Sequence, residues 1–262
     1  MEKRRIAIGS AGRALAFCSL LGAVASTAGC PVTQSQDTPV SELRLSVPQS
    51  DTKYWLYVPS YYSDANDWPL VVTLHGTHGW DGSRRQIMEW KYLAEQRGVI
   101  VAAPDLRSVQ GILPVEESLW QRDLDADDRT ILATIDDVCK RYRVDAKSVL
   151  LTGFSAGGYP MYYTGLRHPE RFDMLIARGC NSSLDIFESF QLSEAARDIP
   201  IAIFWGRDDL KAIGDQSWQA IRWLSEHGFR HVERNKTKGG HLRRPDMAYS
   251  YWRKVLPQRH RR

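Results

Sequence analysis

The chain has 262 residues, of which 43% are hydrophobic and 25% charged, a composition typical of a globular protein with one sizeable core. Its formal net charge is +4, but loss of residues 1–29 would remove four basic side chains and one acidic one and leave +1. The mature chain then has no basic stripe except residues 259–262, so its charge gives no support to nucleic-acid binding.

Residues 1–29 have the pattern of an export signal. Basic side chains precede an apolar run of about 13 residues, which is shorter than the roughly 20 residues that a membrane-spanning helix needs. The run ends at Ala28-Gly29-Cys30, which resembles a bacterial lipobox with Cys30 as the lipidated residue. We expect an exported lipoprotein of the bacterial cell envelope, periplasmic or at the surface, that touches the membrane only through this anchor. Plain secretion and an uncleaved anchor are the alternatives.

Residues 30–40 are polar and rich in turn formers, which predicts a tether ahead of one folded domain over residues 41–262. In that domain, alternating apolar residues predict two antiparallel strands at 43–47 and 54–58. Continuous apolar runs predict buried parallel strands at 70–74, 99–103, 148–152, 174–177 and 199–205. Helices are expected between and after them at 85–97, 125–142, 156–167, 214–228 and 244–255. The pattern predicts the α/β class, with a mostly parallel, doubly wound sheet and antiparallel N-terminal strands.

Two further expectations concern single positions in this scheme. The acidic residues of 123–128 are expected in the first turn of a helix, where the helix dipole favours them. Cys139 and Cys180 are expected to be buried free thiols, because the predicted elements place them at opposite edges of the sheet, beyond the roughly 7 Å that a disulfide allows.

Residues 148–158 contain the clearest chemical motif. The strand Ser148–Thr152 is followed by Gly153-Phe154-Ser155-Ala156-Gly157 and then by a predicted helix. This G-x-S-x-G in a strand-turn-helix context is the nucleophile elbow, in which glycines permit a sharp turn and the serine hydroxyl stands above the sheet. Ser155 is therefore the predicted nucleophile.

A serine nucleophile needs a base and an acid that orients the base. Asp209 follows the predicted strand 199–205 and is the expected acid, with Asp208 as the alternative. His241, after Gly239-Gly240 and before the last helix, is the expected base. The other downstream histidines fall in a helix, a turn or the tail and are weaker candidates; they are His168, His227, His231 and His260.

Two backbone N–H groups are expected to stabilise the oxyanion of the reaction. One belongs to Ala156, at the start of the elbow helix. The other belongs to Thr77, in the loop His75-Gly76-Thr77-His78 that follows strand 70–74. His75 and His78 have no carboxylate partner at metal-ligand spacing, so we expect them to support the loop and expect no metal site.

Together, these motifs resemble the α/β-hydrolase superfamily, and within it the feruloyl and acetyl-xylan esterases and polyhydroxybutyrate depolymerases, over roughly residues 52–256. The motifs are His75-Gly76, Gly153–Gly158, Gly206–Asp209 and Gly239–His241. The resemblance implies a serine ester hydrolase that forms an acyl-enzyme and uses no cofactor. It also implies as substrates esters of plant polysaccharides, polyesters or small acyl esters.

The substrate site is expected to be open, because about 18 residues between Cys180 and Ile199 leave no room for a large lid. Trp80, Trp120 (in the predicted loop 105–122) and Trp205 are candidates for an aromatic platform, although tryptophans more often belong to a core. Asn181 is a further candidate for the pocket lining.

Two other functions fit some of these features. A serine peptidase of the prolyl-oligopeptidase type shares the order serine, acid, histidine, but it usually carries an additional domain for which this chain has no room. A non-catalytic envelope lipoprotein that kept the fold and binds a ligand or partner would not need the intact set of Ser155, Asp209 and His241.

Overall fold

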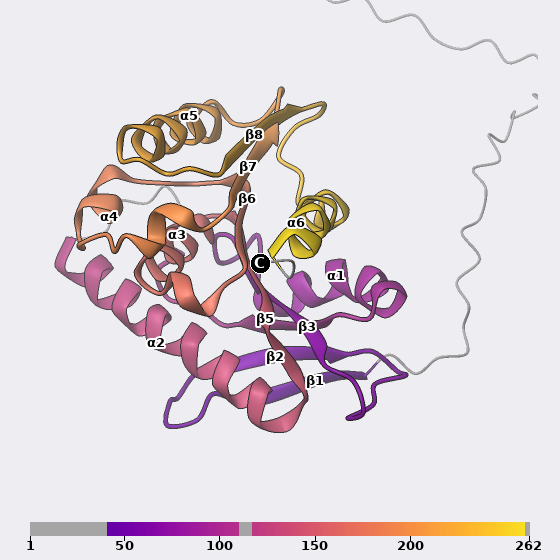
Figure 1. The fold of residues 1–262 in the computed structure, drawn as a ribbon. Coiled ribbons are helices and arrows are strands. Elements are labelled where there is room, and N and C mark those ends of the chain that lie inside the picture. Colours follow the sequence, from indigo (N-terminus) through magenta and orange to yellow (C-terminus); the bar gives the residue numbers. More distant parts are fainter. Residues whose placement is uncertain (1–40, 110–116, 260–262) are drawn as a thin grey trace, which may run out of the picture. The chain divides into compact units, whose positions relative to one another are not determined.

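The computed structural model describes residues 41–109 and 117–259, so the predicted signal peptide, Cys30, the tether and His260 lie outside the described residues. Within the described ranges, eight strands form one sheet (Figure 1) in the order β1-β2-β4-β3-β5-β6-β7-β8. The strands are β1 (Ser41–Ser46), β2 (Lys53–Val58), β3 (Trp68–Leu74), β4 (Ile100–Pro104), β5 (Val144–Ser155), β6 (Met174–Cys180), β7 (Ile201–Gly206) and β8 (Val232–Thr237). Among the described helices, none is long and apolar enough to cross a membrane.

The pairing of the strands confirms the predicted fold class. β2 pairs antiparallel with β1 on one side and with β4 on the other. The other neighbouring pairs are parallel, and they are β4–β3, β3–β5, β5–β6, β6–β7 and β7–β8. Every residue of β4, β6 and β7 is buried, because these mostly apolar strands are covered on both faces. In a parallel arrangement the carboxyl ends of β3, β5, β6 and β7 meet at one edge of the sheet, where the candidate residues follow them.

Helices cover both faces of the sheet (Figure 1). They are α1 (Ser83–Arg97), α2 (Glu117–Arg141), α3 (Gly158–Arg167), α4 (Leu184–Glu188), α5 (Lys211–Glu226) and α6 (Pro245–Arg259), with the 3₁₀ turns η1 (Pro169–Arg171) and η2 (Ala195–Asp198). α1 and α6 pack on one face, and α2, α3 and α5 pack on the other. Each layer encloses its own apolar core, so residues that alternate along a strand, such as Val71 and Val72, belong to different cores.

Several details differ from the expectations. α2 begins at Glu117 rather than near residue 125, so Trp120 lies on a helix and the acids of 123–128 lie inside it, not in its first turn. The buried Asp127 accepts hydrogen bonds from the backbone N–H groups of Arg107 and Ser108. Cys180 is buried as expected, but Cys139 is exposed, because it falls on the outer side of α2.

The segment between β6 and β7 is short, as expected. Within it, the described residues form only the five-residue helix α4 and the four-residue turn η2. This confirms the expectation that no large lid is inserted at this point of the sheet.

Candidate active site

Ser155 lies at a sharp turn between β5 and α3. Its backbone has φ of 53°, a left-handed conformation that is uncommon for a serine and costs on the order of 1–3 kcal/mol. The turn is tight because a Cβ at Gly153 would lie 2.6 Å from the carbonyl oxygen of Gly157, and a Cβ at Gly157 would lie 2.6 Å from that of His75. The two glycines therefore allow the turn that the G-x-S-x-G motif predicts.

Asp209 and His241 form a direct pair. Oδ1 of Asp209 lies 2.8 Å from Nδ1 of His241, and because a carboxylate can only accept, Nδ1 carries the hydrogen and Nε2 is the basic nitrogen. The Asp209 carboxylate also accepts from the backbone N–H groups of Gly206 at 3.2 Å and Leu210 at 2.8 Å, and its side chain is only 2% exposed. Asp208 is exposed, so the geometry favours Asp209 of the two expected acids.

The acid–base pair lies beside the elbow. β6 pairs with β5 up to Ser155 and Cys180, and a Cβ on the preceding Gly179 would lie 3.2 Å from Oδ2 of Asp209 and 3.3 Å from Nδ1 of His241. The His241 ring also contacts the ring of Phe154, with 4.6 Å between their centroids. The structure thus gathers the predicted nucleophile, base and acid at the carboxyl ends of β5, β6 and β7.

The 239–244 loop, which carries His241, lies directly on the end of β7. A Cβ at Gly206 would lie 2.1 Å from the carbonyl oxygen of Gly239 and 2.2 Å from that of Gly240. We expect Gly206→Ala to lower the free energy of unfolding in urea by about 1–3 kcal/mol, because the loop must move to admit the methyl group. The control is Gly214→Ala in α5, where a Cβ would lie 3.7 Å from its nearest atom. This substitution should raise the free energy of unfolding by about 0.5–1 kcal/mol, because alanine favours the helix over glycine. Equal urea midpoints for Gly206→Ala and wild type would contradict this close contact.

The 75–81 loop follows β3 and lies against the elbow. A Cβ at Gly76 would lie 3.0 Å from the Cβ of Ser155, and the backbone N–H of Gly76 donates to Oδ2 of Asp81 at 2.7 Å. The carbonyl of Thr77 accepts from the N–H groups of Trp80 and Asp81, which closes a turn. Thr77 is half-buried and Ala156 is fully buried. The two expected oxyanion donors therefore belong to segments that meet at Ser155.

His75 and His78 contact the backbone. Nε2 of His75 accepts from the N–H of Leu106 at 3.1 Å, so its Nδ1 carries the hydrogen and donates to the carbonyl of Gly76 at 2.8 Å. Burial lowers the pKa of His75, which agrees with a neutral ring. Nε2 of His78 lies 2.7 Å from the carbonyl of Leu106. Both rings thus tie the 75–81 loop to the segment after β4.

The alternative histidines lie elsewhere. His227 ends α5, where its ring stacks on Trp223 with 3.9 Å between centroids. His231 is exposed just before β8, and His168 lies 3.3 Å from a carboxylate oxygen of Asp128, after α3. In the described part of the chain, His241 is the histidine that contacts Asp209.

The four expected substrate contacts differ in exposure. Trp80 is 75% exposed, whereas Trp205 is 3% exposed and packs edge-on against Trp218. Trp120 is half-buried and packs edge-on against Tyr159. Asn181 is buried, and its amide donates to Oε1 of Gln216 at 2.9 Å. Of the three tryptophans, only Trp80 offers most of its ring to solvent.

One group of polar residues beneath the site was not anticipated from the sequence. We call it the buried arginine cluster, and its members are Asp81, Gln86, Glu89, Arg178 and Arg243. The available signal was Arg178 itself, a charged residue directly after the predicted strand 174–177 and before Gly179. In the structure β6 continues to Cys180 and Arg178 is fully buried.

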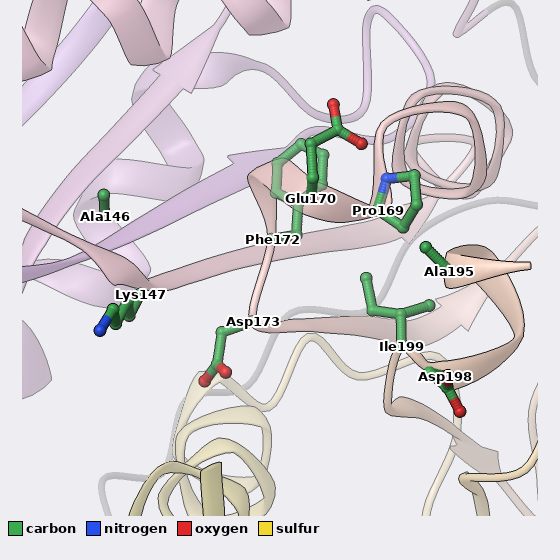
Figure 2. Close-up of a pocket in the computed structure, with 9 residues that line it drawn as sticks. All are labelled: Ala146, Lys147, Pro169, Glu170, Phe172, Asp173, Ala195, Asp198 and Ile199. Atoms are coloured by element: carbon green, nitrogen blue, oxygen red, sulfur yellow. The ribbon is translucent and has the colours of Figure 1, made fainter. Parts of the chain in front are cut away.

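A hollow of about 490 Å³ lies at another part of the molecule, and Figure 2 shows residues that line it. It is lined among others by Lys147 near the start of β5, Asp173 just before β6 and Ile199 just before β7. These residues lie at the amino ends of the parallel strands, whereas Ser155, Asp209 and His241 lie at the carboxyl ends. The hollow is therefore separate from the candidate active site.

Comparisons with known proteins agree with this arrangement. The model of the Esterase family matches residues 46–243. The chain is 29% identical over 154 residues, 59% of its length, to a bifunctional acetylxylan esterase/xylanase from Neocallimastix patriciarum. The chain matches only 21% of that relative, so it spans about a fifth of the length of the curated relative.

Solved structures show the same fold. A CE1 ferulic acid esterase from Anaeromyces mucronatus, determined with ferulic acid, has a TM-score of 0.61 at 13% identity, over 83% of this chain and 89% of that one. An acylaminoacyl peptidase from Pyrococcus horikoshii has a TM-score of 0.53 at 18% identity, over 78% of this chain and 38% of that one. At these identities the likeness shows the fold, which confirms the expected α/β-hydrolase architecture.

Proposed function

Because the chain belongs to the Esterase family, and is therefore a hydrolase that acts on esters, we propose that it cleaves them through a triad of Ser155, His241 and Asp209. The observation that carries the proposal is the 2.8 Å contact between His241 Nδ1 and Asp209 Oδ1 beside the strained turn at Ser155. This contact leaves Nε2 of His241 as the nitrogen that can take a proton.

In the proposed first half-reaction, Oγ of Ser155 attacks the carbonyl carbon of the ester while Nε2 of His241 takes the hydroxyl proton. The carbonyl oxygen becomes an oxyanion that accepts from the backbone N–H groups of Thr77 and Ala156. When the intermediate collapses, the bond to the alcohol oxygen breaks and His241 returns the proton to that oxygen. The acyl group then remains on Ser155.

In the second half-reaction, water attacks the acyl carbon and His241 takes the proton of the water. Collapse of the second intermediate releases the carboxylic acid and returns a hydrogen to Oγ of Ser155. Asp209 keeps its negative charge throughout and stabilises the imidazolium that forms twice. The residues of the chain account for every proton transfer in this scheme.

We propose small acyl esters of a carbohydrate or other bulky alcohol as the substrate class. The curated relative is named for acetylxylan, an acyl group on a polysaccharide, and the structural neighbour is named for ferulic acid, which supplies an acyl group. The absence of a large insertion between β6 and β7 in the described chain supports an open site that a polymer can approach. Trp80, which is 75% exposed, is the proposed contact for a sugar or phenolic ring.

Trp205, Trp120 and Asn181 have a different proposed part in substrate binding. Their burial and their contacts with Trp218, Tyr159 and Gln216 support a role in shaping the walls of the site rather than in covering a ring of the substrate.

We also propose export with Cys30 as the lipid attachment site, residues 1–29 as signal peptide, residues 30–40 as tether and residues 41–262 as the hydrolase domain. The support is the sequence pattern of basic, apolar and small residues ahead of Cys30. An open active site that follows a polar tether suits substrates outside the cytoplasm.

The test compares ester and amide substrates on the purified protein. We expect turnover of p-nitrophenyl acetate and methyl ferulate, little turnover of a short peptidyl p-nitroanilide, and labelling by a fluorophosphonate probe at Ser155. Preference for acetate or ferulate would identify the acyl group. Cleavage of the anilide without preference for esters would favour the peptidase function, which the fold of the Pyrococcus peptidase also accommodates. Failure of the probe to label folded protein would favour a non-catalytic role.

A further inference from the structure

Arg178 is a fully buried charge that the proposed mechanism does not use. It lies on β6 directly before Gly179, and none of its surface is exposed to solvent. Its Nε donates to Oγ1 of Thr152 at 3.0 Å, and its Nη2 donates to Oγ1 of Thr73 at 2.9 Å. Burial lowers the pKa of Arg178 to about 10, so the guanidinium remains charged at neutral pH. A buried charge destabilises the fold unless its hydrogen-bonding groups are paired. The hydrogen bonds of Arg178 therefore indicate what this buried charge does.

The second amino group of Arg178 reaches the loop that carries the base. Nη1 of Arg178 donates to the backbone carbonyl of Arg243 at 3.2 Å, two residues after His241. The Arg243 side chain turns back over the elbow, where its guanidinium lies 4.7 Å from the centre of the Phe154 ring. The same ring contacts His241, so Arg178 and Arg243 together hold the His241 loop against β5.

The cluster also reaches the 75–81 loop. Oε1 of Gln86 accepts from Nη2 of Arg178 at 2.7 Å, and Nε2 of Gln86 donates to Oδ2 of Asp81 at 2.8 Å. The same Asp81 oxygen accepts from the N–H of Gly76. A continuous chain of hydrogen bonds therefore runs from the loop of Thr77, through Gln86 and Arg178, to the loop of His241.

Glu89 balances the positive charge of this cluster. Its Oε1 lies 2.6 Å from Nε of Arg243, and Asp81 Oδ1 lies 3.4 Å from Nη2 of Arg243. Burial raises the pKa of Glu89 to about 7, although Arg178, Arg243 and Arg85 oppose this shift; the nearby Asp81 adds to it. The ion pair with Arg243 therefore forms as Glu89 loses its proton with rising pH around 7, and it weakens as Glu89 takes up a proton with falling pH.

We propose that Arg178 is a positioning residue for ester hydrolysis: through the buried arginine cluster it holds the His241 loop and the Thr77 loop in register around Ser155. The inference rests on the proposed function. Arg178 is placed to act through the two loops rather than by contact with the substrate. Its loss should therefore lower kcat, which depends on the placement of the reacting groups, more than it changes KM. Networks that combine charge-assisted hydrogen bonds with ion pairs are suited to this task, since together they resist small displacements.

The experiment compares Arg178→Met with Arg178→Lys and with the control Arg230→Met, whose exposed arginine pairs with Asp198 at the opposite edge of the sheet. For Arg178→Met we expect kcat for p-nitrophenyl acetate to fall on the order of 10²-fold, because small misplacements of reacting groups are this costly. KM should change by less than about twofold, since binding contacts are untouched. Arg178→Lys should recover part of the loss, because it keeps the charge without the planar fork. Backbone hydrogen exchange over residues 238–244 should be faster in Arg178→Met.

Glu89→Gln provides a second variant that keeps the shape of the half-buried side chain. We expect a smaller loss of kcat at pH 8. We also expect a shallower decline of kcat/KM below pH about 7 than in the wild type, because the variant cannot take up the proton at position 89 that weakens the ion pair with Arg243. A purely structural role of Glu89 would lower the melting temperature and leave the shape of this pH profile unchanged.

The outcomes separate the inference from the proposed function. A folded Arg178→Met with wild-type kcat and unchanged exchange over residues 238–244 overturns the positioning role while ester hydrolysis stands. If Arg178→Met does not fold, the test is the pH dependence of kcat/KM in Glu89→Gln. A decline below pH about 7 that differs from that of the wild type supports the positioning role of Arg178, and an identical decline overturns it. A wild-type protein without ester turnover overturns the proposed function and this inference with it.

Discussion

Replacement of Ser155 by alanine is expected to lower kcat for p-nitrophenyl acetate about 10⁶-fold, the scale of loss when the nucleophile of such a triad is removed. The hydroxyl is the only group at this turn that can form the acyl-enzyme, and His241 cannot activate a methyl group. The measurement is the initial rate with wild type and variant at equal concentration, together with labelling by the fluorophosphonate probe. Both signals should disappear in Ser155→Ala.

Ser250→Ala is the matched control, because Ser250 is exposed on α6 and its hydroxyl donates only to the backbone carbonyl of Asp246 among the contacts described. Its activity should equal that of the wild type. Turnover by Ser155→Ala above about 1% of the wild-type rate would rule out Ser155 as the nucleophile, since residual catalysis by binding and oxyanion donors is far smaller.

Asp209→Asn should lower kcat about 10⁴-fold while the protein stays folded. An asparagine amide at this position can donate to Nδ1 of His241, which moves the ring hydrogen to Nε2 and leaves no basic nitrogen for Ser155. The substitution keeps the size of the side chain, and the N–H of Gly206 can still donate to an amide oxygen at the Oδ2 position, although the N–H of Leu210 loses its acceptor at Oδ1. The rate should therefore fall far more than the stability, which thermal unfolding measures.

Asp208→Asn is the control within the same turn. Asp208 is exposed, and its backbone N–H rather than its side chain contacts the 239–244 loop, at 3.0 Å from the carbonyl of Gly239. We expect its kcat to stay within about threefold of the wild type, as is usual for a surface substitution. A large loss in Asp208→Asn with a small one in Asp209→Asn would exchange the two assignments.

Most of the sheet could be predicted because its inner strands are short continuous apolar runs. β3, β4 and β7 occur within one or two residues of the predicted ranges, and the alternating segments that became β1 and β2 pair antiparallel as expected. The elbow was also predictable, since a strand, two glycines and a serine at fixed spacing allow few other turns. These signals are local, so a single sequence is enough to read them.

The features that the sequence did not predict depend on contacts with residues that are distant along the chain. β8 reads Val-Glu-Arg-Asn-Lys-Thr, in which four of six residues are exposed, so no apolar run marks it as a strand. It becomes one because it pairs with β7 along its whole length. The predicted strand 174–177 stops before Arg178, and an arginine is almost never fully buried unless it is paired. Its burial depends on Thr73, Gln86 and Thr152, which are distant in the sequence.

In the candidate site, too, some features follow from the local sequence and others depend on residues that are distant along the chain. The residue types and their order along the chain predicted Ser155, Asp209 and His241 as the groups to look for. Which of Asp208 and Asp209 faces His241 depends on the tight turn after Gly206, whose geometry arises from contact with the 239–244 loop. The support of that loop by Arg178 and Glu89 involves three separate segments and leaves no pattern in the sequence.

Both outer strands of the sheet carry charged side chains, and this bears on how the protein behaves when concentrated. β1 at one edge includes Glu42 and Arg44, which pair with Lys91 and Asp105, and β8 at the other includes Arg234 and Lys236. An unpaired edge strand invites a strand from another copy to add to it, and charged residues there oppose such growth. A sheet that ends in this way on both sides resists edge-to-edge aggregation, which matters for an enzyme expected to work without intracellular chaperones.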